Sequence, residues 1–155
     1  MNKEKLYCLL MYPGGPTMQA MPAIQCFQFD FDPRYERAAR LLGIRPHNAW
    51  VEVGDGLLEA RYGRWRVRTG LENVSSARIT GPYRFIKTAG PPRLGITDLG
   101  LTFASNGRCG VLICFRRRVA GIDRFGLARH GELTVTVAEP DELVGVLQAA
   151  TTGRR

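Results

Sequence analysis

The sequence lacks the short motifs that mark common catalytic sites. Its 155 residues contain no GxSxG nucleophile elbow, no HExxH zinc motif, no phosphate-binding P-loop and no GxGxxG dinucleotide fingerprint. Histidine occurs only twice and no two cysteines form a CxxC pair, which argues against a zinc site or a redox pair. We therefore predict no catalytic residue, no cofactor and no metal ion.

Long apolar runs are also missing. No run approaches the roughly 20 residues that span a bilayer, so no transmembrane helix is expected. The apolar stretch at residues 6–12 is short and no A-x-A cleavage pattern follows it, which makes it a poor signal peptide. Isolated cysteines at positions 8, 26, 109 and 114 suit a reducing compartment. These absences predict a cytoplasmic protein and leave open a peripheral attachment to a membrane.

Positive charge, by contrast, is abundant and unevenly spread. Lys and Arg number 22 against 14 Asp and Glu, a formal net charge of +8. Residues 61–129 hold 14 basic and 3 acidic groups, a net charge of +11. Most of the bases are arginine, whose planar fork matches carboxylates and phosphates. An anionic partner is one interpretation, and a GC-rich coding bias that makes arginine the default surface cation is the other.

The hydrophobic pattern predicts a mainly β protein of the α+β kind. Period-two alternation and turn residues predict seven or eight short strands between residues 24 and 138. A short helix is expected over residues 33–42, capped by Asp32 and ended by Gly43. A second, amphipathic helix follows the last strand. We expect a flexible tail at residues 1–23, a single domain at 24–150 and a frayed end at 151–155.

Dense antiparallel strands followed by one helix predict a barrel or sandwich whose open end the helix caps. Five stretches carry a resemblance to known proteins: AWVEVGDGLLEARYGRWRVRT, Gly81-Pro82-Tyr83, AGPPRLGITDLGLTFASN, GIDRFGLARHGELTVTV and DELVGVL. Together they resemble an uncharacterised actinobacterial protein family with a bacterial pleckstrin-homology-like domain, over about residues 27–148. The resemblance implies a pleckstrin-homology-like fold, and it implies no cofactor, catalytic residue or substrate.

One predicted strand concentrates arginines on a single face: Arg64, Arg66 and Arg68. Side chains alternate along a strand, so Trp65 and Val67 point to the opposite face. Arg61 lies on the preceding strand, across the Gly63 turn, and can join the strip. The strip is a candidate site for phospholipid head groups, nucleic acid or an acidic protein. The alternative is a solvated hairpin face that guards against edge pairing.

A loop bracketed by Gly81-Pro82 and Gly90-Pro91-Pro92 mixes aromatic and basic side chains: Tyr83, Arg84, Phe85, Ile86 and Lys87. Exposed residues of this kind suit a membrane interface, a protein hot spot or stacking on single-stranded bases. The alternative is that Phe85 and Ile86 fold back onto the core. We predict that this loop and the arginine strip together form the partner-binding face.

The end of the strand at residues 110–115 is a third basic feature. Arg116, Arg117 and Arg118 follow it, either as a solvated strand exit or as one rim of a basic mouth with Arg124 and Arg129. His130, in the predicted loop before the last strand, could act there as a general base beside Asp98 or Asp123. Its alternative role is a surface or loop-anchoring histidine.

These features support three hypotheses about function. The first is a non-catalytic binding module for an acidic protein or peptide, or for an anionic lipid. The second is a small-ligand-binding protein or enzyme that uses the barrel mouth near His130. The third is nucleic-acid binding, which the charge allows although the chain carries no recognition motif.

Overall fold

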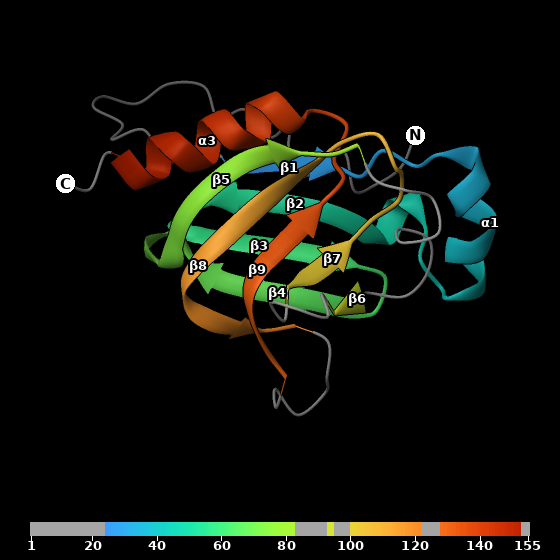
Figure 1. Cartoon of the computed structure of the whole chain (residues 1–155), viewed down its shortest axis with the longest axis horizontal. Coiled ribbons are helices and arrows are strands. Elements are labelled where there is room, and N and C mark those ends of the chain that lie inside the picture. The colour runs from blue at the N-terminus through green and yellow to red at the C-terminus, as the bar shows by residue number, and fades with distance from the viewer. Residues whose placement is uncertain (1–23, 83–92, 95–99, 122–127, 153–155) are drawn as a thin grey trace, which may run out of the picture.

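The computed structural model describes residues 24–82, 93–94, 100–121 and 128–152 (Figure 1). The predicted tail at residues 1–23 and the aromatic–basic loop residues 83–87 lie outside the described residues. Within the described ranges the chain forms a four-stranded sheet, a five-stranded sheet and two α-helices. The prediction of a mainly β protein with a helix after the last strand is confirmed.

The first sheet is antiparallel and its strands follow chain order: β1 (Gln25–Gln28), β2 (Ala49–Gly54), β3 (Leu57–Tyr62) and β4 (Trp65–Gly70). The β2–β3 turn places Asp55 and Gly56 at φ of 50° and 75°. Two consecutive residues in the left-handed region are typical of the two-residue turns that match strand twist. The turn at Gly63 is equally short, because Tyr62 pairs with Trp65. These tight turns fix the register of all three strands.

The second sheet has the order β5-β8-β9-β7-β6, with these bounds: β5 (Val74–Thr80), β6 (Arg93–Leu94), β7 (Leu101–Phe103), β8 (Gly110–Ala120) and β9 (Arg129–Val135). All its strand pairs are antiparallel except β7 with β9, which is parallel. A parallel pair requires a crossover that local sequence signals do not reveal. It was not expected from the sequence.

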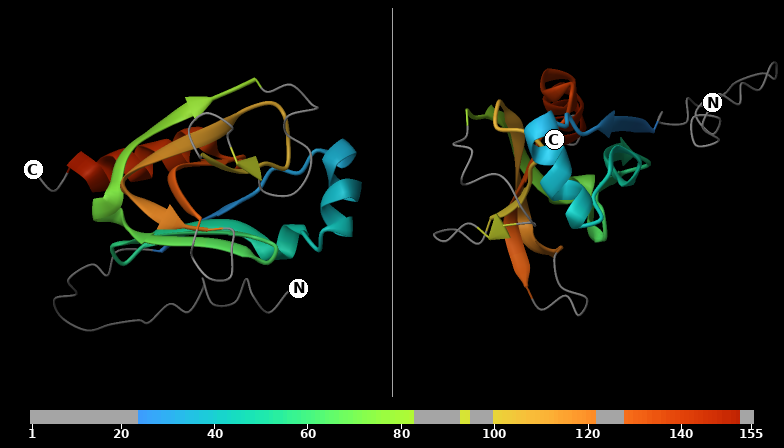
Figure 2. Two further views of the ribbon diagram at one scale, coloured as in Figure 1. Left: turned by 60° about the horizontal axis from the view of Figure 1, so that its bottom comes forward. Right: turned by 90° about the vertical axis from the view of Figure 1, so that its right-hand side faces the viewer.

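The two sheets pack face to face and do not close into a barrel (Figures 1 and 2). They meet at one corner through a bridge between Phe29 and Val137. At the opposite side, no ladder among the described residues joins β4 to β5 or β8. The closed-barrel form of the prediction is therefore wrong, because β4 leads into the short helix η3 (Leu71–Asn73) rather than into a paired strand.

The first α-helix begins at the residue that the sequence predicts. Asp32 caps α1 (Pro33–Leu41), and its Oδ1 accepts a hydrogen bond from Arg34 N at 2.9 Å. A short 3₁₀ helix, η2 (Pro46–Asn48), leads from α1 to β2. The C-terminal helix α3 (Pro140–Thr152) packs on β5 and β8 and continues into the segment expected to fray.

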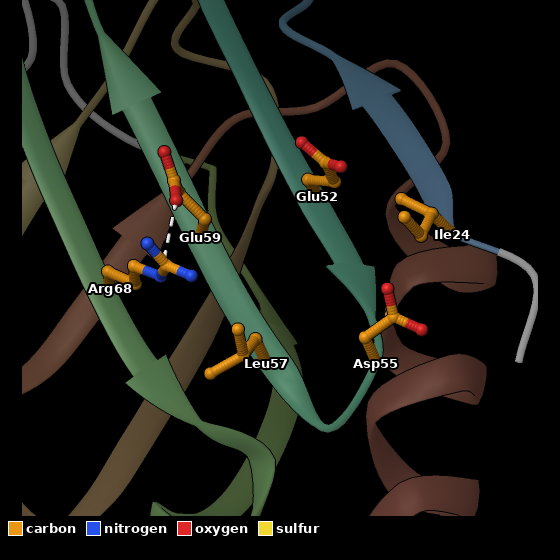
Figure 3. A pocket seen from close by; sticks show the side chains of 7 residues that line it. Ile24, Glu52, Asp55, Leu57, Glu59 and Arg68 are labelled. Carbon is orange, nitrogen blue, oxygen red and sulfur yellow. Dashed lines mark ion pairs between the residues drawn. The ribbon is translucent and has the colours of Figure 1, made fainter. Parts of the chain in front are cut away.

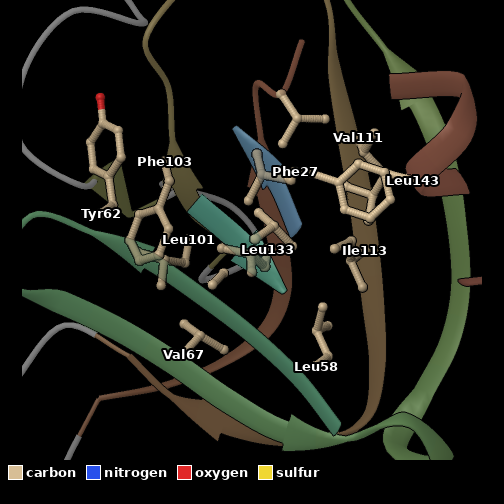
Figure 4. Close-up of a cluster of buried hydrophobic side chains, with 14 of the residues drawn as sticks. Phe27, Leu58, Tyr62, Val67, Leu101, Phe103, Val111, Ile113, Leu133 and Leu143 are labelled. Carbon is tan, nitrogen blue, oxygen red and sulfur yellow. The ribbon is translucent and has the colours of Figure 1, made fainter. Parts of the chain in front are cut away.

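The hydrophobic core lies between the sheets (Figure 4). Leu58, Tyr62 and Val67 enter it from the first sheet, and Phe103 and Leu133 from the second. The Tyr62 ring stacks on Phe103 with centroids 5.3 Å apart, and its hydroxyl donates to Ala104 O at 2.5 Å. Burial raises the pKa of Tyr62 above its usual value near 10. This side chain therefore links the two sheets as a neutral donor.

Candidate anion-binding surface

Arg66 and Arg68 of the predicted arginine strip lie on the outer face of the first sheet. Arg64 lies in the turn before β4, with its guanidinium 4.7 Å from the centroid of the Trp65 ring. Trp65 and Val67 are buried, whereas Arg64, Arg66 and Arg68 are exposed, so the predicted alternation is confirmed. Arg61 lies directly opposite Arg66 in the β3–β4 ladder and joins the strip, as expected. Two like charges directly opposite each other destabilise a sheet unless an anion lies near them.

Glu59 is the anion that the chain itself supplies. It lies opposite Arg68, with its carboxylate 3.6 Å from Arg68 Nε and 3.7 Å from Arg66 Nε. Both arginine side chains remain about half exposed, so these are surface ion pairs of small energetic weight. Counting outward from the two-residue Gly63 turn pairs position 59 with position 68. The length of this turn could therefore have predicted from the sequence that Glu59 lies opposite Arg68.

A pocket of about 210 Å³ opens on the same face, at the Asp55 end of the sheet (Figure 3). Its lining contains three carboxylates and one arginine among apolar and glycine residues: Ile24, Glu52, Gly54, Asp55, Leu57, Glu59 and Arg68. The outer face of the first sheet is therefore mixed in sign. Arg68 lies beside the carboxylates that line the pocket, whereas Arg61 and Arg66 lie nearer the Gly63 turn.

Three further arginines form a bulge in β8. Ladder pairing with β9 stops at Cys114 opposite Glu132 and resumes at Val119 opposite His130. The β8 strand thus contains more residues than β9 between these pairs, and the surplus includes Arg116, Arg117 and Arg118. All three are exposed, and none forms an ion pair with another described residue. The prediction that the strand ends before them is wrong, because β8 continues to Ala120.

The buried Asn73 side chain connects the bulge to β4. Its Oδ1 accepts from Arg117 N at 2.8 Å, while its Nδ2 donates to Arg117 O at 2.9 Å and to Thr69 Oγ1 at 3.0 Å. Thr69 follows Arg68, so the bulge lies beside the end of β4. We call the combined set the arginine surface: Arg66, Arg68, Arg116, Arg117 and Arg118. All five arginines are candidates in the sequence, but the proximity of the two groups is not predicted, because residues 73 and 117 are far apart in the chain.

His130 is a buried residue of the second sheet. It belongs to β9, is 1% exposed and takes no part in lining the pocket on the first sheet. A surface position for His130 is therefore wrong, because β9 begins four residues earlier than the period-two pattern indicates. Its suggested partners Asp98 and Asp123, and the rim residue Arg124, lie outside the described residues.

The described residues contain few other groups that could bind a ligand or a metal ion. No group of three or more His, Cys, Asp or Glu side chains among them could hold a metal ion. Arg108 forms an ion pair with Asp30, and this hydrogen bond raises the pKa of the arginine. No helix in the described ranges is long and apolar enough to cross a membrane.

Comparison of the chain with known protein families, with curated proteins and with solved structures finds no match.

Proposed function

We propose that this protein is a non-catalytic binding module of the pleckstrin-homology-like class, and that its arginine surface binds an acidic segment of a partner protein. The observation that carries the proposal is the β8 bulge. Arg116, Arg117 and Arg118 are consecutive, exposed and without an ion-pair partner among the described residues. Two packed sheets with a C-terminal helix support the proposed class.

An acidic segment fits this surface better than an extended anion does. The carboxylates of Glu52 and Asp55 share the outer face with Arg68, so a long nucleic acid or a flat anionic membrane placed there would meet repulsion. A membrane would also gain from an apolar side chain to insert. The exposed large hydrophobic residues of the described ranges lie away from the bulge: Ile24 at the pocket, Leu41 on α1 and Ile79 on β5.

The test is a charge reversal with a matched control. Arg116→Glu/Arg118→Glu and Arg34→Glu/Arg37→Glu both lower the net charge from +8 to +4. The first pair lies in the bulge, and the second on α1 at the other end of the molecule (Figure 1). We expect the bulge variant to bind a fluorescent polyglutamate peptide about tenfold more weakly, because two attractive contacts become repulsive. The α1 variant should bind nearly as tightly as the wild type.

Fluorescence anisotropy at two salt concentrations measures both affinities, and a thermal melt checks folding. Equal losses in the two variants would show a response to net charge alone and overturn the proposal. So would wild-type affinity in the bulge variant. Vesicles with phosphatidylserine and single-stranded DNA serve as further probes. Binding of either one through the bulge, with no binding of polyglutamate, would replace the acidic protein segment with that ligand.

Removing the carboxylate of Glu59 should strengthen binding. Glu59 lies within 4 Å of both Arg66 and Arg68 and therefore competes with the carboxylates of a ligand. Glu59→Gln should raise the affinity for polyglutamate about two- to fivefold at low salt, the range expected of surface ion pairs. Glu36→Gln is the matched control, because Glu36 pairs with Arg40 on α1. An equal gain in that control, or a weaker-binding Glu59→Gln, would contradict a contact between ligand and β4.

A further inference from the structure

The side-chain amide of Asn73 makes the hydrogen bonds that the backbone of a neighbouring strand would otherwise make with the β8 bulge. The β5–β8 ladder reaches no further than Val74 opposite Phe115, and the β8–β9 ladder resumes only at Val119. The strand ladders therefore leave Arg117 without a partner on either side. A strand residue normally bonds its N–H and C=O to a neighbouring backbone. The side-chain amide of Asn73 carries the same two groups and satisfies both at 2.8 and 2.9 Å.

The Asn73 amide is itself fixed. It is 8% exposed, lies in η3 at the end of β4, and also donates to Thr69 Oγ1 at 3.0 Å. Its contacts orient the Arg117 backbone from the protein interior while the three arginine side chains face solvent. A loop of three charged residues without such a tether would lose more conformational freedom on binding.

We propose that Asn73 is a positioning residue, which holds the β8 bulge in the conformation that binds the acidic segment. This inference rests on the proposed function and adds to it a determinant that carries no charge. Its rival is a purely structural role, in which Asn73 ties β4 to β8 and affects only stability. The two roles differ in what happens to the affinity of the folded protein.

Asn73→Ala tests the inference, because it leaves every charge in place. At a temperature where the variant is fully folded, we expect polyglutamate affinity to fall about five- to tenfold, since the bulge must be ordered on binding. The salt dependence should keep its wild-type slope, and the Arg117 amide should exchange faster with solvent. Ser105→Ala is the matched control for stability. It removes the hydrogen bonds of a buried serine hydroxyl, from Ser105 Oγ to Asp30 O at 2.7 Å and between Ser105 Oγ and Thr136 Oγ1 at 2.9 Å, and should leave affinity unchanged.

Thr69→Val provides a milder variant if Asn73→Ala does not fold. It keeps the volume of the side chain and removes only the acceptor of Asn73 Nδ2, so we expect about a twofold loss of affinity. Wild-type affinity in folded Asn73→Ala, or in Thr69→Val if Asn73→Ala does not fold, overturns the positioning role. If Arg116→Glu/Arg118→Glu still loses binding, the proposed function survives that result. Wild-type affinity in Arg116→Glu/Arg118→Glu overturns the proposed function and this inference together.

Discussion

Leu147→Asp is expected to lower the free energy of unfolding by about 4 kcal/mol or more, or to abolish cooperative folding. Leu147 is a fully buried residue of α3, and this helix packs on β5 and β8. A carboxylate at this position would lose its hydration without gaining a partner, and the apolar contacts of leucine would be lost as well. Urea unfolding followed by circular dichroism measures the effect.

Ala149→Asp is the matched control for this change. Ala149 is an exposed residue of the same helix, two positions from Leu147, so its replacement carries only a helix-propensity cost of about 0.7 kcal/mol. If Leu147→Asp unfolded at nearly the same urea concentration as the control, α3 would be a peripheral element. The C-terminal helix would then not complete the core.

Features that depend on neighbouring residues could be predicted from the sequence. The Asp32-Pro33 pair marks the start of α1, and the short turns at Asp55-Gly56 and Gly63 set the first three hairpin strands. Each signal is local, because capping and left-handed turn residues act within a few positions. The outward direction of the arginines on β4 follows from the same alternation.

Features that depend on distant contacts could not be predicted. Three consecutive arginines interrupt the period-two pattern, yet β8 continues through them with Asn73 bonded to Arg117 across 44 positions. His130 is polar and lies in the loop predicted before the last strand, yet β9 includes it and buries it. The parallel pairing of β7 with β9 likewise depends on topology rather than on local sequence. The sequence therefore predicts the outward direction of the arginines on β4, but not that the β8 bulge lies beside them.

The corner where the two sheets meet is the second place where a single substitution should have a large effect. Asn106 is 1% exposed and its amide bonds three groups there. Its Nδ2 donates to Asp30 O at 2.9 Å and to Asp30 Oδ2 at 3.1 Å, and its Oδ1 accepts from Arg108 N at 2.9 Å. Ser105 adds a further bond to Asp30 O. This amide therefore connects the segment after β1 with the turn before β8.

Asn106→Ala is expected to lower the free energy of unfolding by about 2–3 kcal/mol, because it leaves the Arg108 N–H without its acceptor and opens a small cavity. Arg108→Ala is the matched comparison at the same corner. It removes the ion pair with Asp30, whose arginine side chain is 65% exposed, and exposed ion pairs contribute little to stability. Urea unfolding of both variants at neutral pH measures the difference. A loss on Arg108→Ala as large as that on Asn106→Ala would mean that the exposed ion pair, and not the buried amide, holds the two sheets together at this corner.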